Sequence, residues 1–214
     1  MIKAAIFDLD GVIVDTAHYH YIAWKRLASE FGINLTPSQN ELLKGVSRMK
    51  SLEIILDMGK VNLSEGEKEK LAERKNKWFV EYIESIRPEE IFPGVKELLT
   101  QIRQQGIKTG LASSSKNAPR VIELLGIASE FDTLVDGTMI VHTKPDPEIF
   151  LLTARNLGVK PAACVVFEDA EAGVEAAKAA GMKCVGVGSV DQLSKADRVI
   201  ARTGDFNLAW LDQL

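Results

Sequence analysis

Ala4-Ala5-Ile6-Phe7 runs directly into Asp8-Leu9-Asp10-Gly11-Val12, and this stretch indicates the class of fold. The apolar run predicts a short buried strand, and Gly11 predicts a turn just after it. Ligands usually bind at that end of a strand in a parallel sheet. Two neighbouring carboxylates repel each other, and a hard cation relieves the repulsion. The stretch therefore predicts either a carboxylate nucleophile beside a proton-transferring carboxyl group or a plain strand that ends in an Asx-type turn.

Length, composition and charge restrict the classes of protein. The chain has 214 residues, of which 46% are hydrophobic and 26% charged, as in a globular protein of one domain or slightly more. The formal net charge of -4 argues against a nucleic-acid partner. No signal peptide and no membrane-spanning run is recognisable, so we expect a cytoplasmic chain without a membrane partner. Cys164 and Cys184 each lie in an apolar run, which predicts small core residues in a reducing compartment.

Strand and helix signals alternate from about residue 92 onward. Helices are predicted to begin at Asn117, Asp146 and Asp169 and to end before a glycine. The predicted strands are residues 108–112, 133–135, 163–167, 183–187 and 198–200. Strands separated by helices imply a parallel sheet, and the strand at residues 4–9 joins it. We expect an α/β fold with a doubly wound, Rossmann-like parallel sheet.

Residues 15–91 interrupt this alternation because no segment within them predicts a strand. Capping boxes at Thr36-Pro37-Ser38-Gln39 and Ser64-Glu65-Gly66-Glu67 begin two of about four predicted helices. The sequence therefore predicts a small all-helical cap domain over residues 15–91. This domain is inserted into a catalytic core that comprises residues 1–14 and 92–214.

Polar residues follow several predicted strands of the core. Ser113-Ser114-Ser115-Lys116-Asn117 comes after residues 108–112, where hydroxyl groups and amides before a helix favour an anion. Lys144 precedes another helix, and Glu168-Asp169 ends a strand with two oxygen ligands suited to magnesium. Taken singly, each motif also has a simpler interpretation. The serines fit an ordinary loop, Lys144 fits a surface position, and the two acids fit the start of a helix, where they interact favourably with its dipole.

The order of these motifs along the chain resembles the haloacid dehalogenase superfamily. The resemblance implies that Asp8 is the nucleophile, which becomes an aspartyl-phosphate, and that Asp10 is the general acid and base. It implies that Ser113 and Lys144 hold the phosphate. The presence of Asp10 disfavours a dehalogenase, because dehalogenases of this superfamily do not need the second acid.

The same resemblance implies one Mg²⁺ per chain. Its ligands would be Asp8, the Asp10 carbonyl group, Glu168 and Asp169. Phosphoryl transfer develops charge on oxygen atoms, and such a cation helps to neutralise that charge.

The predicted cap narrows the resemblance further. Leu43-Lys44-Gly45-Val46-Ser47-Arg48 and Ala112-Ser113-Ser114-Ser115-Lys116-Asn117 resemble signatures of the β-phosphoglucomutase family, as does the predicted helix that carries His20 and Trp24 after Asp15-Thr16. There, Arg48 would hold the distal phosphate, Lys44, Gly45 and Val46 would line the sugar site, and His20 would touch the sugar. Taken alone, His20 fits an interdomain contact and Arg48 a surface charge. The other ligand-binding positions implied by the resemblance are Thr16, Trp24, Ser47, Lys75, Asn76, Ser114, Ser115, Lys116 and Asn117. The sequence departs from the family pattern at Ser114 and in the polar segment 135–143.

The resemblance implies an isomerase that interconverts β-D-glucose 1-phosphate and glucose 6-phosphate, with glucose 1,6-bisphosphate as activating intermediate. A sugar-phosphate or phosphoglycolate phosphatase with the same active site is the alternative, and Arg48 is the residue that discriminates between them. A non-catalytic phosphosugar-binding module is a third class, which would tolerate the loss of Asp10 or Asp169. We expect a sugar phosphate as the ligand and a monomeric chain.

Overall fold

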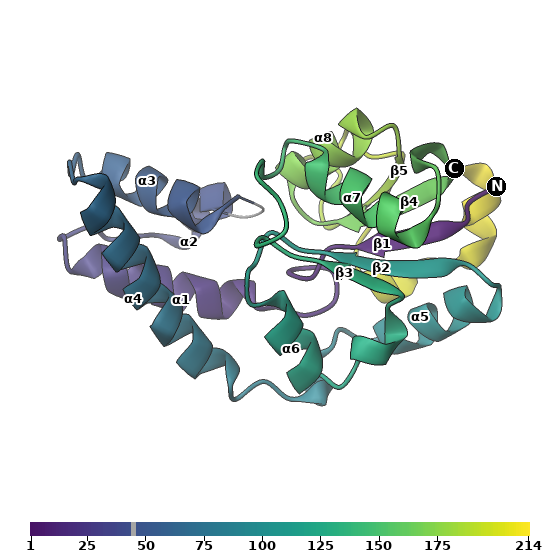
Figure 1. The fold of residues 1–214 in the computed structure, drawn as a ribbon, viewed down its shortest axis with the longest axis horizontal. Helices are drawn as coiled ribbons and strands as arrows, with labels where there is room; N and C mark the ends of the chain where they lie inside the picture. Colours follow the sequence, from purple (N-terminus) through teal and green to yellow (C-terminus); the bar gives the residue numbers. More distant parts are fainter. Residues whose placement is uncertain (44–45) are drawn as a thin grey trace.

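A computed structural model describes residues 1–43 and 46–214, and a parallel sheet lies at its centre (Figure 1). Six strands pair in the order β3-β2-β1-β4-β5-β6, and every pair is parallel. The strands are β1 (Ala4–Phe7), β2 (Lys108–Ala112), β3 (Thr133–Val135), β4 (Cys164–Glu168), β5 (Lys183–Val187) and β6 (Arg198–Ile200). From the central strand β1 the chain adds β2 and β3 on one side and β4, β5 and β6 on the other. The prediction of a doubly wound sheet is therefore confirmed.

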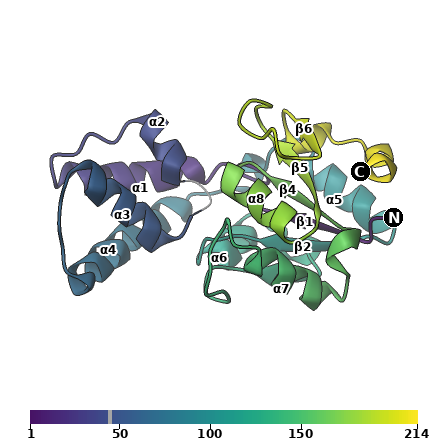
Figure 2. The same cartoon turned by 90° about the horizontal axis from the view of Figure 1, so that it is seen from above.

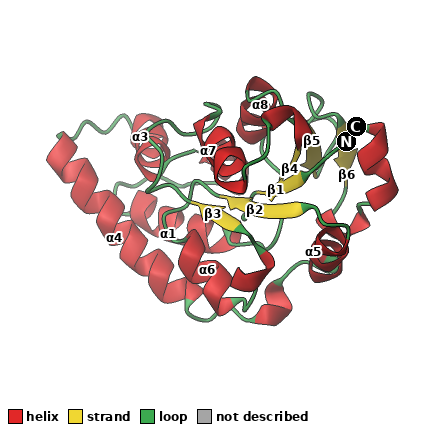
Figure 3. Ribbon diagram, turned by 45° about the vertical axis from the view of Figure 1, so that its right-hand side comes forward, coloured by secondary structure: helices red, strands yellow, loops and turns green. Residues whose placement is uncertain are grey.

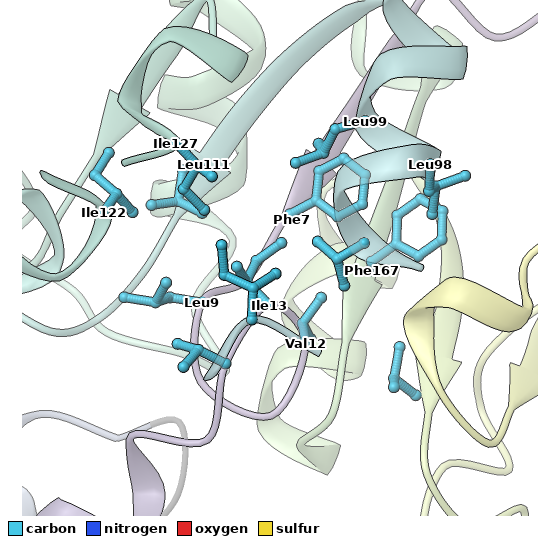
Figure 4. Packing of buried hydrophobic residues seen from close by; sticks show 14 of the residues in the cluster. Phe7, Leu9, Val12, Ile13, Leu98, Leu99, Leu111, Ile122, Ile127 and Phe167 are labelled. Carbon is cyan, nitrogen blue, oxygen red and sulfur yellow. The ribbon is translucent and has the colours of Figure 1, made fainter. Parts of the chain in front are cut away.

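Helices cover both faces of the sheet, as Figures 1 and 3 show. Helices α5 (Val95–Gln104) and α6 (Ala118–Leu124) pack on one face, and α7 (Glu148–Leu157) and α8 (Glu171–Ala179) pack on the other. Figure 4 shows the first face, where Phe7 and Phe167 stack with ring centroids 4.6 Å apart. Cys164 and Cys184 are buried on the second face, which confirms that they are core residues.

A group of helices lies beyond the carboxyl ends of the strands (Figure 2). It comprises α1 (Ala17–Ser29), α2 (Pro37–Asn40), α3 (Arg48–Met58) and α4 (Glu65–Ile83), and it has its own apolar cluster. The two connections to the sheet run side by side, since the amide of Phe92 donates to the carbonyl oxygen of Ile13 at 2.9 Å. Both predicted capping boxes form. The domain boundaries at 14/15 and 91/92 stay predictions.

Short 3-10 turns complete the described chain. They are η1 (Glu41–Leu43), η2 (Pro88–Glu90), η3 (Ala128–Glu130), η4 (Pro161–Ala163), η5 (Thr203–Asp205) and η6 (Leu208–Gln213). None of the helices in the described residues is long and apolar enough to cross a membrane.

Two predicted helix starts differ from the structure, and at a third the predicted cap residue makes no cap hydrogen bond. Helix α8 begins at Glu171 rather than Asp169, because the Glu168 carboxylate accepts the amide of Ala170 and holds this segment outside the helix. Helix α7 begins at Glu148, and the Asp146 side chain accepts the Glu148 amide at 2.9 Å. Asn117 occupies the N-cap position of α6, but its side chain makes no cap hydrogen bond.

Candidate active site

The predicted acidic residues meet at the carboxyl edge of the sheet. Strands β1 and β4 are neighbours, with Phe7 opposite Phe167, so the residues that follow them, Asp8 and Glu168, lie side by side. Both side chains are buried. The parallel register therefore brings together two carboxylates that are 160 positions apart in the sequence.

Lys144 provides the positive charge between these carboxylates. Its Nζ donates to Oδ1 of Asp8 at 2.5 Å and to Oε2 of Glu168 at 2.8 Å, and the side chain is fully buried. Burial lowers the pKa of a lysine, but the Asp8 and Glu168 carboxylates outweigh that effect and raise the pKa of Lys144. Lys144 is thus a fixed cation directly behind Asp8.

Asp8 and Asp10 are close in sequence but differ in surroundings. The backbone amide of Asp10 donates to Oδ2 of Asp8 at 2.9 Å, which orients that carboxylate. Oδ1 of Asp10 is buried and has no hydrogen-bond partner in the described part of the chain. Burial, reinforced by the charge of Asp8, raises the pKa of Asp10 to about 8. At neutral pH Asp10 is therefore a carboxylic acid with a proton to give.

Three carboxylates at this edge fit a divalent cation. Asp8, Glu168 and Asp169 each offer a ligand oxygen, and these atoms all lie within 4.8 Å of one another. Gly11 has φ +76, and a Cβ atom there would come within 2.1 Å of the Asp169 carboxylate. Glycine is thus required for the backbone to approach Asp169. Oxygen ligands in such a cluster are the type that Mg²⁺ prefers.

The serine-rich loop continues β2 along the same edge. Ser113 is buried, its backbone amide donates to the carbonyl oxygen of Val135, and its Oγ accepts the amide of Ser115 at 3.2 Å. Gly137 packs against this loop, because a Cβ atom there would lie 2.2 Å from the carbonyl oxygen of Ser114. The polar segment 135–143 therefore supports the position of the serine loop.

One cavity joins the sheet edge to the helical cap, with about 960 Å³ of empty space including its opening to solvent. The site residues predicted from the sequence that line this cavity are Asp8, Asp10, His20, Trp24, Val46, Ser47, Arg48, Lys75, Ser113, Ser114, Ser115, Lys116 and Asp169. Sequence reasoning missed Ala17, Asn40, Leu43, Ser51, Gly137 and Thr143 as site residues, although Leu43 begins a quoted motif. These six carry no strong motif signal, since they are small, apolar or isolated polar residues.

Other predicted residues lie elsewhere. Lys144 and Glu168 stand behind Asp8 rather than in the cavity wall. Thr16 is buried before α1 and does not line the cavity. Lys44 and Gly45 lie outside the described residues.

The cap wall holds a buried lysine–histidine contact. Nζ of Lys75 lies 2.7 Å from Nδ1 of His20, and it also lies 4.4 Å from the centroid of the Trp24 ring. The His20 ring stacks on Phe79, with ring centroids 3.9 Å apart. Burial, with the nearby positive charges of Lys75 and Arg48, lowers the pKa of His20 well below its usual value, so the imidazole is neutral.

Two polar contacts fasten the α4 segment of the cap to α6 of the core. Nδ2 of Asn117 donates to Oδ1 of Asn76 at 2.8 Å, and the Asn117 side chain makes no cap hydrogen bond to its own helix. Arg120 makes a two-pronged contact with Glu84, at 3.0 and 2.8 Å. Neither Asn76 nor Asn117 lines the cavity.

Comparison with known proteins identifies the family. A model of haloacid dehalogenase-like hydrolases matches residues 2–181. The chain belongs to the haloacid dehalogenase-like hydrolase family. The resemblance inferred from the order of the motifs is thereby confirmed.

Relatives within the haloacid dehalogenase-like hydrolase family include mutases and phosphatases. The β-phosphoglucomutase of Bacillus subtilis is 46% identical over 99% of this chain and 94% of its own length. A phosphorylated carbohydrates phosphatase of Thermotoga maritima is 35% identical over 85% of this chain and 82% of its own length. The crystal structure of β-phosphoglucomutase from Clostridium difficile superposes with a TM-score of 0.96 at 45% identity, covering 100% of this chain and 96% of that one.

Proposed function

We propose that the protein is a β-phosphoglucomutase, an isomerase that interconverts β-D-glucose 1-phosphate and glucose 6-phosphate. One cavity is lined by Asp8 and Asp10 at the sheet edge and by Arg48 on the cap, and this observation carries the proposal. Such a cavity suits a sugar with a reacting phosphate at one end and a second phosphate at the other. The near-full-length similarity to the Bacillus subtilis and Clostridium difficile β-phosphoglucomutases supports the same assignment.

The proposed reaction begins with a phosphorylated Asp8. The sugar C6 hydroxyl of glucose 1-phosphate attacks the phosphorus atom, and the bond between phosphorus and Asp8 breaks. Asp10 takes the hydroxyl proton, because it is ionised at this stage after giving its own proton to O1 in the half-reaction that phosphorylated Asp8. The resulting β-glucose 1,6-bisphosphate turns around in the cavity. Asp8 then attacks the C1 phosphate, the bond from phosphorus to O1 breaks, and Asp10 returns its proton to O1.

The other residues of the core hold the reacting groups. Lys144 fixes one oxygen of Asp8 and supplies positive charge, and Ser113 offers a hydroxyl group to the phosphoryl oxygens. Asp8, Glu168, Asp169 and the Asp10 carbonyl group would hold one Mg²⁺, which when bound neutralises charge on the transferring phosphoryl group. Fewer positive charges at this edge would leave the phosphate and the carboxylates in mutual repulsion.

The cap residues are proposed to select a sugar rather than water as the phosphoryl acceptor. Arg48 would hold the second phosphate in a charge-assisted contact, while His20, Trp24, Val46, Ser47 and Lys75 would surround the sugar. A phosphate that bridges cap and core favours the closed cavity, from which water is excluded. Lys44, Gly45 and Thr16 keep the sugar-site roles that the resemblance gives them, as part of the proposal, and Asn76, Lys116 and Asn117 would complete the cap–core boundary.

Replacing Asp169 by alanine tests the metal assignment. We expect Asp169→Ala to raise the Mg²⁺ concentration needed for half-maximal activity and to lower activity far more than the melting temperature, since this side chain is only half-buried. The measurement is a Mg²⁺ titration of glucose 6-phosphate formation, with exposed Asp57→Ala as control. Equal activity with EDTA and with Mg²⁺ would contradict the assignment.

Replacing Arg48 by alanine separates mutase from phosphatase. We expect Arg48→Ala to lower mutase turnover by about 10- to 100-fold, the scale of a lost charge-assisted hydrogen bond, and to leave acetyl phosphate hydrolysis nearly unchanged. The assay follows glucose 6-phosphate and inorganic phosphate together from β-glucose 1-phosphate with a trace of glucose 1,6-bisphosphate. Lys50→Ala, on the exposed side of the same helix, is the matched control.

The competing phosphatase function predicts a different pattern. The native protein would then release mainly inorganic phosphate from glucose 1-phosphate, and Arg48→Ala would leave the product ratio unchanged. The phosphatases among the relatives make this the second candidate.

A further inference from the structure

Asn40, the last residue of α2, is a polar cavity residue to which the proposed mechanism gives no role. The residue is only 8% exposed, and it lines the cavity. Its backbone amide donates to the carbonyl oxygen of Thr36, but its side-chain amide has no hydrogen-bond partner among the described residues. The amide atoms are open to the cavity, since they are not among the fully buried polar atoms without a partner. A ligand that fills the cavity cuts this amide off from solvent, which costs free energy unless the ligand supplies hydrogen-bond partners.

The chemistry of the side chain favours a hydroxyl group as that ligand. The cap wall already offers Arg48 to a phosphate, and its guanidinium group presents donors only. The Asn40 amide presents an acceptor oxygen and two donor hydrogens, without charge. A sugar hydroxyl both donates and accepts, so it matches an amide, whereas a phosphate dianion is better matched by the Arg48 cation.

Ser51 is another polar residue of the cap that lines the cavity, and its hydroxyl group is engaged within the cap. Oγ of Ser51 donates to the carbonyl oxygens of Ser47 and Leu43, at 3.1 and 3.5 Å. The hydroxyl hydrogen of Ser51 is therefore already used within the cap, and the hydroxyl oxygen can act toward a ligand mainly as an acceptor. Asn40 can donate to a hydroxyl oxygen on this side of the cavity and accept from a hydroxyl hydrogen as well.

We propose that Asn40 hydrogen-bonds a ring hydroxyl of the sugar and is a specificity-determining residue of the site. The residue would make the cavity prefer polyhydroxylated phosphate esters to simple acyl or alkyl phosphates. This inference rests on the proposed function, because it assigns a sugar phosphate to the cavity. It adds a hydroxyl-binding position on the cap, in the same cavity as the residues proposed for the phosphate.

The test replaces Asn40 with leucine, which has a similar size and no polar atoms in its side chain. We expect Asn40→Leu to lower kcat/KM for β-glucose 1-phosphate by about 10- to 100-fold, the loss typical of an unmade hydrogen bond to substrate. Acetyl phosphate hydrolysis changes less than about twofold, because that substrate has no hydroxyl group to lose. The melting temperature stays equal or rises, since no side-chain hydrogen bond within the described part of the protein is broken. Asn34→Leu, at an exposed cap position, is the matched control.

Singly deoxygenated glucose 1-phosphates identify the hydroxyl. With the native enzyme, we expect one analogue to show a loss of kcat/KM similar to that of Asn40→Leu with the complete sugar. When Asn40→Leu is assayed with that analogue, the two losses should not add. An unchanged kcat/KM in Asn40→Leu, an equal loss with acetyl phosphate, or additive losses with every analogue would overturn the inference. If Asn40→Leu does not fold, Asn40→Ala is measured against the same criteria.

Binding measurements separate this inference from the proposed function. Calorimetric titration of glucose 6-phosphate into Asp8→Asn, with and without Asn40→Leu, reports hydroxyl recognition without turnover. Release of phosphate alone by the native protein would refute the mutase function and leave the Asn40 result standing. Equal affinities in the two titrations would refute the role of Asn40 and leave the mutase function standing.

Discussion

Asp8→Asn is expected to abolish turnover, with a loss of four or more orders of magnitude, on the order of that seen when a catalytic nucleophile is removed. An amide does not attack phosphorus at a useful rate. The amide oxygen can still accept a hydrogen bond from Lys144 or from the Asp10 backbone, so the fold is expected to persist. The measurement is glucose 6-phosphate formation, together with circular dichroism.

Intact mass spectrometry gives a second measurement of the same prediction. The native protein incubated with acetyl phosphate and Mg²⁺ should carry one phosphoryl group on Asp8, and Asp8→Asn should carry none. Asp191→Asn, at an exposed position, is the matched control and should behave as the native protein. Near-normal activity in Asp8→Asn would refute the aspartyl-phosphate mechanism.

Asp10→Asn is expected to lower mutase turnover by about 10²- to 10⁴-fold, the contribution typical of general acid–base catalysis. The variant should still accept a phosphoryl group from acetyl phosphate, whose leaving group needs no proton. The two variants therefore separate the nucleophile from the proton donor. Loss of phosphorylation by acetyl phosphate in Asp10→Asn would contradict this division of roles.

Stability provides a pH-dependent readout for Asp10. Its pKa is raised from 3.8 to about 8, chiefly by burial, so between these values the folded state holds a proton that the unfolded state has released. Raising the pH from 4 to 8 therefore removes stability from the native protein. The side-chain amide of the Asp10→Asn variant cannot ionise, so the variant does not lose this stability. In EDTA, the melting temperature of the variant minus that of the native protein should therefore increase as the pH rises from 5 to 8. A constant difference across this range would contradict the raised pKa.

The core fold could be predicted closely because its local signals are strong. The predicted strands at 108–112, 133–135, 183–187 and 198–200 match β2, β3, β5 and β6, and β4 is shifted by one residue. Alternating apolar runs and capped helices define a parallel sheet almost by themselves. The predicted start of α8 is wrong because the Glu168 carboxylate takes the Ala170 amide, a contact that no local pattern indicates.

Some residues of the candidate site could be predicted from the sequence and others could not. Asp8, Asp10, Glu168 and Asp169 were predictable because strand ends in a parallel sheet share one edge. The cavity position of Asn40 was not predictable, since an isolated asparagine after a capping box is also typical of a helix end. Its burial depends on how α2 packs against the rest of the cap.

The sequence by itself determined the parallel α/β sheet, the helical insertion and the set of acidic and basic residues, because short-range patterns and motif order carry that information. Only the tertiary structure decided that Lys144 lies between Asp8 and Glu168, that Asn117 bonds Asn76 rather than its own helix, and that Arg48 faces the same cavity as Asp8. These contacts join residues far apart in the chain. Their distances, and the burial that raises the pKa of Asp10, arise only when the separate elements pack together and exclude water.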